Sequence, residues 1–305
     1  MSNLAPVILF AYNRPEHTKK TLRSLQQNYL ADESTLIIYI DGPKNNATEE
    51  QLQNIIKVKE VVREQLWCKD VKIIEATENK GLAASVISGV ANTVNKYGKA
   101  IVLEDDLVSD KWFLKFMNDA LDTYENHLDV ICVSGYIYPV DKSLPESFFL
   151  KGADCWGWAT WKRAWDILDM NGVELLKKIE DNNLAADFNF LNTYPYTQML
   201  KDQITKKNNS WAILWYASAY LNNKYTLYPG KSLIHNIGID GSGTHSATST
   251  NFDVEIQNKE TRVELLEIKE NVEAKKIIAE YFKKIHETPN QSFLNKIINK
   301  LKSFV

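Results

Sequence analysis

Short apolar runs alternate with longer amphipathic segments along the first 135 residues of the chain. The runs with the length and composition of strands cover residues 7–12, 36–41, 71–76, 100–104 and 130–134. Most of them are almost uninterrupted in their apolar character, as expected of strands that are buried on both faces of a sheet. This alternation predicts an α/β fold in which a mixed sheet is flanked by helices.

The segments between these runs carry the 3.6-residue apolar period of helices. They cover residues 17–28, 48–65, 81–97 and 111–127. Pro15 suits the first turn of the first helix. Thr48, followed three residues later by Gln51, has the form of a capping box at the start of the second helix.

The rest of the chain is less regular. Residues 136–250 are rich in aromatic side chains. Residues 260–287 have the pattern of a charged amphipathic helix that Pro289 ends, and residues 291–305 form a last short amphipathic segment. We therefore expect a C-terminal helical extension.

Composition excludes several classes of protein. With 305 residues, 44% of them hydrophobic, the chain can bury a full core and is not disordered. The formal charge of −3, from 36 basic and 39 acidic residues, gives no general attraction to nucleic acid. The three cysteines form no CxxC pair, so we expect neither a disulfide framework nor a zinc ribbon, and a reducing compartment fits best.

The sequence also shows no pattern of a signal peptide or of a membrane span. The N-terminus has no basic region followed by an apolar one, and no run approaches the about 18 apolar residues of a membrane span. We therefore expect a cytoplasmic protein.

Three adjacent acids follow the fourth apolar run. Glu104, Asp105 and Asp106 come directly after the apolar residues 101–103. Because ligands bind at the carboxyl ends of the strands in such sheets, the acids lie where chemistry is expected, although three acids in a row also suit a solvated turn. Mn²⁺ or Mg²⁺ prefers carboxylate oxygens and leaves positions open for substrate phosphates. A nucleoside diphosphate with a metal is the natural ligand pair for this motif.

Polar residues follow the other strands as well. Arg14 suits a surface cation or a clamp for phosphate and base, because its guanidinium forms a planar fork. Asp41 suits either a turn or an acceptor of a hydrogen bond from a base or ribose. Asn79, Lys80 and Gly81 precede a helix, whose N-terminus favours an anion, although helix capping explains Gly81 equally well. The chain contains neither GxGxxG after its first strand nor GxxxxGK[ST], which argues against a dinucleotide oxidoreductase and a P-loop nucleotidase.

Six ordered motifs together resemble a bacterial sugar transferase of the glycosyltransferase family 2 type, over residues 5–250. They are Leu9-Phe10-Ala11-Tyr12-Asn13-Arg14-Pro15, Asp41-Gly42-Pro43, Asn79-Lys80-Gly81-Leu82, Val102-Leu103-Glu104-Asp105-Asp106-Leu107, Val133-Ser134-Gly135-Tyr136 and Trp156-Gly157-Trp158-Ala159-Thr160-Trp161. The EDDL element is also similar to that of the N-acetylglucosaminyltransferase I group. The resemblance implies the GT-A fold, a Rossmann-like nucleotide-sugar-binding sheet, over residues 1–250. Its nucleotide-sugar-binding half would span residues 1–135, its acceptor-side half 136–250, and the helical extension 251–305.

The resemblance also implies roles for the strand-end residues. Arg14 and Asp41 would contact the nucleotide of a nucleotide-diphospho-sugar, with a UDP-sugar as the expected donor. Asp106 would bind Mn²⁺ or Mg²⁺, and Asp105 would lie nearer the ribose or the donor sugar. His245, in the glycine-punctuated loop 236–245, would complete the metal shell or contact the diphosphate.

Six of the eight tryptophans fall in one stretch of the aromatic region. By the resemblance, Trp156, Gly157 and Trp158 would lie beside the donor sugar and the acceptor, where flat rings stack on sugar rings. The glycine would let a ligand approach the backbone. A buried aromatic core is the alternative for each tryptophan.

An inverting transferase also needs a carboxylate that takes the proton from the acceptor hydroxyl. In the N-acetylglucosaminyltransferase I group this acid lies next to tryptophans, but the equivalent stretch here, residues 210–215, contains no acid. Asp202 is our first candidate for the base, with Asp240 and Asp154 as alternatives.

Together these features predict a metal-dependent, inverting glycosyltransferase of bacterial surface polysaccharide synthesis. It would transfer a sugar to a hydroxyl of a glycan or lipid-linked glycan. Residues 291–305 carry three lysines and no acid beside an apolar stripe, so they either dock on the domain or contact the inner face of an anionic membrane. A sugar nucleotidyltransferase and a non-enzymatic glycan-binding module remain as alternative functions.

Overall fold

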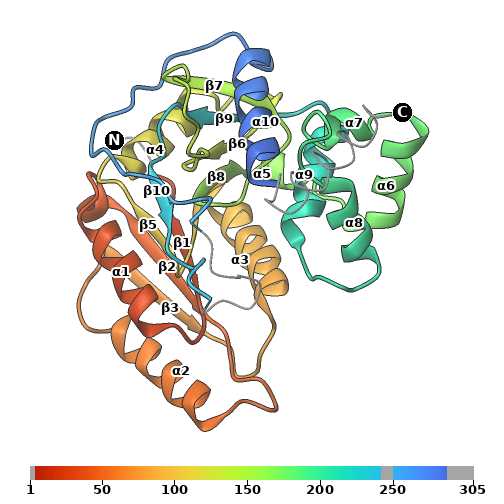
Figure 1. Cartoon of the computed structure of the whole chain (residues 1–305). Helices are drawn as coiled ribbons and strands as arrows, with labels where there is room; N and C mark the ends of the chain where they lie inside the picture. Colours follow the sequence, from red (N-terminus) through yellow and green to blue (C-terminus); the bar gives the residue numbers. More distant parts are fainter. Residues whose placement is uncertain (1–3, 242–249, 287–305) are drawn as a thin grey trace, which may run out of the picture.

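In the computed structural model, which describes residues 4–241 and 250–286, helices flank an eight-stranded mixed sheet (Figure 1). Its strand order is β3-β2-β1-β4-β8-β6-β9-β7. The strands are β1 (Val7–Ala11), β2 (Thr35–Ile40), β3 (Asp70–Glu75), β4 (Lys99–Glu104), β6 (Val130–Ser134), β7 (Ser147–Lys151), β8 (Trp158–Trp161) and β9 (Tyr225–Pro229). A separate antiparallel pair joins β5 (Leu107–Ser109) to β10 (Ile234–Asn236). The predicted α/β fold with a mixed sheet is confirmed.

The five predicted strands agree with β1, β2, β3, β4 and β6 to within one residue at each end. The strands β1 to β4 are parallel to one another, and all but the edge strand β3 are almost fully buried. Strand β8 runs antiparallel to both β4 and β6. The sequence pattern missed β7, β8 and β9, because they lie in the aromatic region where the apolar and polar positions do not alternate regularly.

The predicted helices of the first half are also present. They are α1 (Pro15–Gln26), α2 (Glu49–Val61), α3 (Leu82–Tyr97) and α4 (Phe113–Thr123). Thr48 and Gln51 form the predicted capping box at the start of α2. Pro15 occupies the first turn of α1.

The chain reverses its direction along the sheet between β1 and β4. From β1 it moves outward through α1 to β2 and through α2 to β3, and then α3 returns it past β1 to β4. Because such connections are right-handed, α3 must cover the opposite face of the sheet from α1 and α2, as Figure 1 shows. Neighbouring strands with connections that leave in opposite directions form the switch point at which ligands bind in open α/β sheets.

The second half of the chain adds a helical lobe and a C-terminal helix. The helices of this half are α5 (Lys162–Trp165), α6 (Gly172–Asp181), α7 (Ala185–Phe188), α8 (Tyr196–Ile204), α9 (Trp211–Leu221) and α10 (Val272–His286). Helices α6 to α9 gather at one side of the molecule around their own apolar cluster (Figure 1). Helix α10 packs on Phe148 and Leu150 of β7 and on Tyr228 of β9.

The helix predicted over residues 260–287 is shorter than expected, because it begins only at Val272. Residues 260–269 contain no helix, and Val263, Leu266 and Ile268 pack against the main core. The spacing of the apolar residues in this segment is compatible with a helix and equally compatible with an extended chain that crosses the core. None of the described helices has the length and apolar character that a membrane crossing needs. The predicted segment 291–305 lies outside the described residues.

Candidate active site

The ends of β1 and β4 bring a cation and two acids together at the switch point. Arg14 follows β1, and its Nη2 atom bonds to Asp105 and lies 2.8 Å from the Asp106 Oδ2 atom. Both carboxylates are almost fully buried. The Asp105 carbonyl accepts a hydrogen bond from Thr21 of α1, which ties the helix to the end of β4. The structure thus juxtaposes three of the residues that the sequence singled out.

The third acid, Glu104, is not neutralised by a direct partner. Its half-buried carboxylate has no hydrogen bond within residues 4–241 and 250–286. Burial raises the pKa of Glu104 to about 8, and the charges of Asp106 and Asp105 add to this shift. Burial likewise raises the pKa of Asp105 to about 6, against the opposing effect of Arg14. Three acids therefore share a single cation, so a second positive charge at the cluster would be electrostatically favourable.

The loop after β10 covers these acids. The Ile237 amide donates a hydrogen bond to the Asp106 carbonyl at 2.9 Å. A Cβ atom on Gly238 would clash with the Asp106 carboxylate and would lie 2.9 Å from the Arg14 Nη1 atom, so a larger residue there would have to displace this ion pair. His245, the predicted additional metal ligand in this loop, lies outside the described residues. Within the described part of the chain, no group of three or more His, Cys, Asp or Glu side chains is arranged to hold a metal ion.

Asp41 organises the segment between β3 and α3. Its Oδ1 atom accepts from the amides of Gly42 and Lys80, and its Oδ2 atom accepts from the Gly81 amide and the Asn79 side chain. The structure therefore brings together the predicted residues Asp41, Asn79, Lys80 and Gly81. Gly81 has a φ of 77°, which glycine adopts without strain. Both carboxylate oxygens are engaged in holding this segment, a role that the sequence did not indicate.

Of the predicted sugar-stacking pair, Trp158 is misassigned. It is 1% exposed on the central strand β8 and packs against Trp165, Trp211 and Trp215. Its ring therefore belongs to the core and cannot stack on a sugar in this structure. Trp156 is only half-buried.

Gly157 also has a role in the packing of β8 against β10. Its φ is 61°, and a Cβ atom there would lie 2.5 Å from the Ile234 side chain of β10. The glycine thus allows β8 to start directly beside β10. This close contact with protein explains the glycine without a ligand.

Asp154 lies in surroundings that the sequence did not reveal. Its Oδ2 atom accepts a hydrogen bond of 3.2 Å from the Tyr228 hydroxyl, and its Oδ1 atom accepts from the Cys155 amide. Burial and the neighbouring Asp154 raise the pKa of the Cys155 thiol, and Glu104 and Asp106 raise it further. The charges of the strand-end acids therefore act on Cys155, which is the next residue after Asp154 in the chain. Burial raises the pKa of Asp154 itself.

The other two candidate bases have different surroundings. Asp202, in α8, bonds to Gln198 of the same helix and pairs with Lys207 just beyond it. None of these contacts reaches the strand-end acids. Asp240 lies near them, in the loop after β10, where it bonds to the His17 ring at 3.1 Å.

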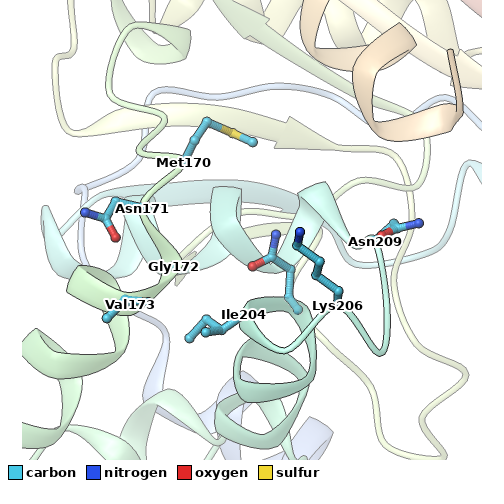
Figure 2. Close-up of a pocket in the computed structure, with 8 residues that line it drawn as sticks. Met170, Asn171, Gly172, Val173, Ile204, Lys206 and Asn209 are labelled. Atoms are coloured by element: carbon cyan, nitrogen blue, oxygen red, sulfur yellow. The ribbon is translucent and has the colours of Figure 1, made fainter.

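A pocket of about 390 Å³ opens in the helical lobe, next in sequence to Asp202. Its lining comes from the start of α6, the end of α8 and the segment after α8 (Figure 2). The lining residues are Met170, Asn171, Gly172, Val173, Gln203, Ile204, Lys206 and Asn209. The pocket contains none of the residues that the sequence singled out.

Comparison with known proteins identifies the class of this fold and site. Residues 7–160 match the family described as Glycosyl transferase family 2, and the chain belongs to this family. Its α/β fold, a mixed sheet flanked by helices, is of the GT-A type. The sequence has no significant match among curated proteins.

Similar solved structures are distant. A crystal structure of S. aureus TarS 1-349 has 15% identity and a TM-score of 0.40; the match covers 76% of this chain and 60% of that one. UDP-glucose pyrophosphorylase complexed with UDP-glucose has 10% identity and a TM-score of 0.36, with 75% and 91% covered. Apo mouse xyloside xylosyltransferase 1 has 11% identity and a TM-score of 0.33, with 60% and 75% covered. The chain thus spans less than two thirds of the TarS structure.

Proposed function

We propose that the protein transfers a sugar from a UDP-sugar, with a divalent metal and with inversion, to a hydroxyl of a glycan in bacterial surface polysaccharide synthesis. The observation that carries this proposal is the cluster of Arg14, Asp105 and Asp106 at the switch point of the sheet. Family membership supports the nucleotide-sugar donor. The similarity of the EDDL element to the N-acetylglucosaminyltransferase I group supports inversion.

The negative charge of the acid cluster supports the binding of a metal ion, although these acids alone do not form a metal site. Among the residues that the structure describes, the half-buried Glu104 carboxylate has no hydrogen-bond partner and lies beside two other acids, and enzymes of the GT-A type typically use a divalent metal. Asp106 would hold Mn²⁺ or Mg²⁺ together with His245. When bound, the metal would stabilise the negative charge of the departing diphosphate.

Arg14 and the segment 79–81, which Asp41 holds, bind the nucleotide. The Arg14 guanidinium presents further donors beside its two acids, and a diphosphate suits this planar fork. Asp105 faces the ribose or donor sugar. Asp41 fixes the backbone of Asn79, Lys80 and Gly81 at the start of α3, and that segment contacts the nucleotide.

Asp154 is the catalytic base. Of the three candidates it combines a half-buried carboxylate, a raised pKa and a neighbour within range of Glu104 and Asp106. A base with a raised pKa accepts a proton more readily near neutral pH than an ordinary aspartate does.

The acceptor is a glycan or a lipid-linked glycan, and the protein works in the cytoplasm at the inner face of the membrane. The support is the sequence of residues 291–305, with Lys296, Lys300 and Lys302 beside an apolar stripe. Such a segment attracts an anionic leaflet.

Turnover of UDP-sugars with and without Mn²⁺ tests this function. We expect metal-dependent hydrolysis or transfer, abolished by EDTA, and at least about a 100-fold loss in Asp106→Ala because its carboxylate binds the metal. Asp166→Ala, on the surface of the molecule, is the matched control and keeps full turnover. Unchanged metal-dependent turnover in Asp106→Ala would refute the metal assignment.

The same assay separates the alternative functions. A sugar nucleotidyltransferase would release pyrophosphate from a nucleoside triphosphate and a sugar phosphate. A glycan-binding module would bind sugar in EDTA and ignore UDP, whereas a transferase shows metal-dependent UDP binding by calorimetry.

A further inference from the structure

The carboxylate of Asp154 is held at both of its oxygen atoms. The Oδ1 atom accepts a hydrogen bond of 2.7 Å from the Cys155 amide, and the Oδ2 atom accepts one of 3.2 Å from the Tyr228 hydroxyl. No other side chain bonds to this carboxylate in the described part of the chain. Tyr228 lies 74 positions away in the sequence. The orientation of the Asp154 carboxylate therefore depends on a residue from a distant strand.

Tyr228 has a fixed position in the sheet. It belongs to β9, which lies between β6 and β7, and it is paired directly with Phe148 of β7. The rings of Tyr228 and Phe148 are stacked, with their centroids 5.9 Å apart and an interplanar angle of 17°. Tyr228 is 7% exposed, and α10 packs on the same apolar cluster. A hydroxyl on a packed ring of an inner strand is well suited to orient a functional side chain.

The Tyr228 hydroxyl is the donor in this hydrogen bond when Asp154 is ionised, because a carboxylate only accepts. Burial raises the pKa of Tyr228 well above its ordinary value, and the charge of Asp154 adds to this shift. The hydroxyl therefore keeps its proton at neutral pH. By donating it to the hydrogen bond, the hydroxyl stabilises the ionised carboxylate and opposes the effect of burial on the pKa of Asp154.

Other titratable groups near Asp154 come from β6 and the segment after it, from the next residue in the chain and from the start of α8. They are Cys132, Tyr136, Tyr138, Cys155, Tyr194 and Tyr196. His286 at the end of α10 contacts the Tyr194 ring, with centroids 5.2 Å apart. The strand-end acids Glu104 and Asp106 act on the Cys155 thiol. Among the described residues, none of these side chains bonds to the Asp154 carboxylate, so a change at Tyr228 alters its side-chain hydrogen bonding without altering the charges around it.

We propose that Tyr228 is a positioning residue for the base: its hydroxyl holds the Asp154 carboxylate in one orientation and favours the ionised form. The hydroxyl acts through Asp154 and not on a substrate. This assignment rests on the proposed function, in which Asp154 takes the proton of the acceptor hydroxyl.

Two replacements of Tyr228 change this hydrogen bond in opposite directions. Tyr228→Phe keeps the packed ring and removes the donor, so the pKa of Asp154 should rise. Replacement of Tyr228 by 3-fluorotyrosine makes the hydroxyl a stronger donor, so the pKa of Asp154 should fall. A carbon-13 NMR titration of the full chain, labelled at its aspartate carboxyl groups, measures both shifts. The Asp154 signal is assigned by its loss in Asp154→Asn.

The rate of transfer should follow the same shifts. Because the base acts only when it is deprotonated, the acid limb of the pH–rate profile should move to higher pH in Tyr228→Phe and to lower pH in the fluorinated protein. Tyr228→Phe should also lower kcat about tenfold at the wild-type optimum, because the carboxylate is less well placed, while the KM for the UDP-sugar stays the same. Tyr220→Phe is the matched control. It removes a buried hydroxyl that bonds to another aspartate, Asp187, at 2.7 Å, and should change neither the titration of Asp154 nor the profile.

An unchanged titration of Asp154 in both Tyr228 replacements would overturn the proposal, as would equal shifts in Tyr220→Phe. Should Tyr228→Phe fail to fold, the sign of the shift in the fluorinated protein still decides. If Asp154→Asn abolishes turnover while neither Tyr228 replacement moves the pH–rate profile, the base assignment stands and the role of Tyr228 is refuted. If the wild-type protein transfers no sugar from any UDP-sugar, the transferase function fails, and the NMR titration alone shows whether Tyr228 holds Asp154.

Discussion

Asp154 illustrates how the surroundings of one carboxylate can fit it for proton transfer. The side chain is half-buried, it accepts hydrogen bonds from the Tyr228 hydroxyl and the Cys155 amide, and no cation contacts it in the described part of the chain. Burial raises its pKa, because the charged form loses hydration, while hydrogen bonds from the Cys155 backbone, the Tyr228 side chain and the Trp156 backbone oppose this shift. The result is a carboxylate that is more basic than an ordinary aspartate.

The pH dependence of transfer follows from this shift. As the proposed base, Asp154 acts only when it is deprotonated, so the rate should fall as the pH drops through a value above the ordinary pKa of an aspartate. Asp154→Asn should lower kcat by about 10²- to 10⁴-fold, the usual contribution of a general base, while the affinity for UDP-sugar stays the same. Steady-state rates between pH 4 and 8 for the wild type and this variant check both effects.

Asp166→Asn, a change at an exposed ion pair with Lys162, serves as the control and keeps the wild-type profile. Wild-type kcat in Asp154→Asn, together with a large loss in Asp202→Asn or Asp240→Asn, would move the base to that residue.

At the level of single residues, the sequence was informative where chemistry follows a strand. Arg14, Asp105 and Asp106 come together because parallel strands deliver their carboxyl ends to one edge of the sheet. The environment of Asp154 could not be predicted, since it is built from residues up to 74 positions away. Trp158 was misread because the aromatic motif alone does not distinguish a core ring from a binding ring.

Among the elements, helix α10 is held to the sheet and to the helical lobe by a buried ion network. Lys275 is 4% exposed, and its Nζ atom lies 2.6 Å from Asp187 of α7 and 3.0 Å from Glu270. Phe149 of β7 forms an isolated bridge with Glu270, and its carbonyl accepts from the Asn271 amide. The network thus joins three parts of the chain at the start of α10.

Lys275→Met should destabilise the protein by about 2 kcal/mol, because it leaves two partly buried acids without their cation. This loss in the free energy of unfolding is smaller than the loss expected for a fully buried ion pair, because the Asp187 side chain is 43% exposed. Urea unfolding followed by circular dichroism measures the change in the free energy of unfolding.

Lys284→Met, in the same helix, breaks an exposed pair with Asp141 and should cost less than about 0.5 kcal/mol. Equal losses in the two variants would show that the buried network does not stabilise α10 more than a surface pair does.

Prediction of whole elements succeeded where the apolar pattern has one interpretation. Strands β1, β2 and β4 are almost continuous apolar runs between helices, and each of β1 to β4 lies within one residue of its predicted bounds. Residues 260–269 are apolar at irregular intervals, which suits both a helix and an extended chain. Packing of Val263, Leu266 and Ile268 on the main core decides between them, and this contact is not visible in the sequence.

For the molecule as a whole, the order of the strands explains why the candidate site lies where it does. The reversal between β1 and β4 could be expected from the α/β pattern, whereas the insertion of β8 between β4 and β6 could not. That insertion brings the start of β8, and with it Asp154 to Gly157, toward the edge that carries the strand-end acids. The acceptor side of the site therefore depends on tertiary structure more than the donor side does.

Membrane association is a property of the whole chain, because it would set the position of the active site relative to a lipid-linked acceptor. Residues 291–305 carry Lys296, Lys300 and Lys302 without an acid. If each lysine contributes about 1 kcal/mol near an anionic surface, replacing all three with glutamine should weaken binding to phosphatidylserine-containing vesicles by about 100-fold. Vesicle sedimentation at low and physiological salt measures this, with neutral phosphatidylcholine vesicles as the control. Unchanged sedimentation after deletion of residues 291–305 would show that this segment does not bind the membrane.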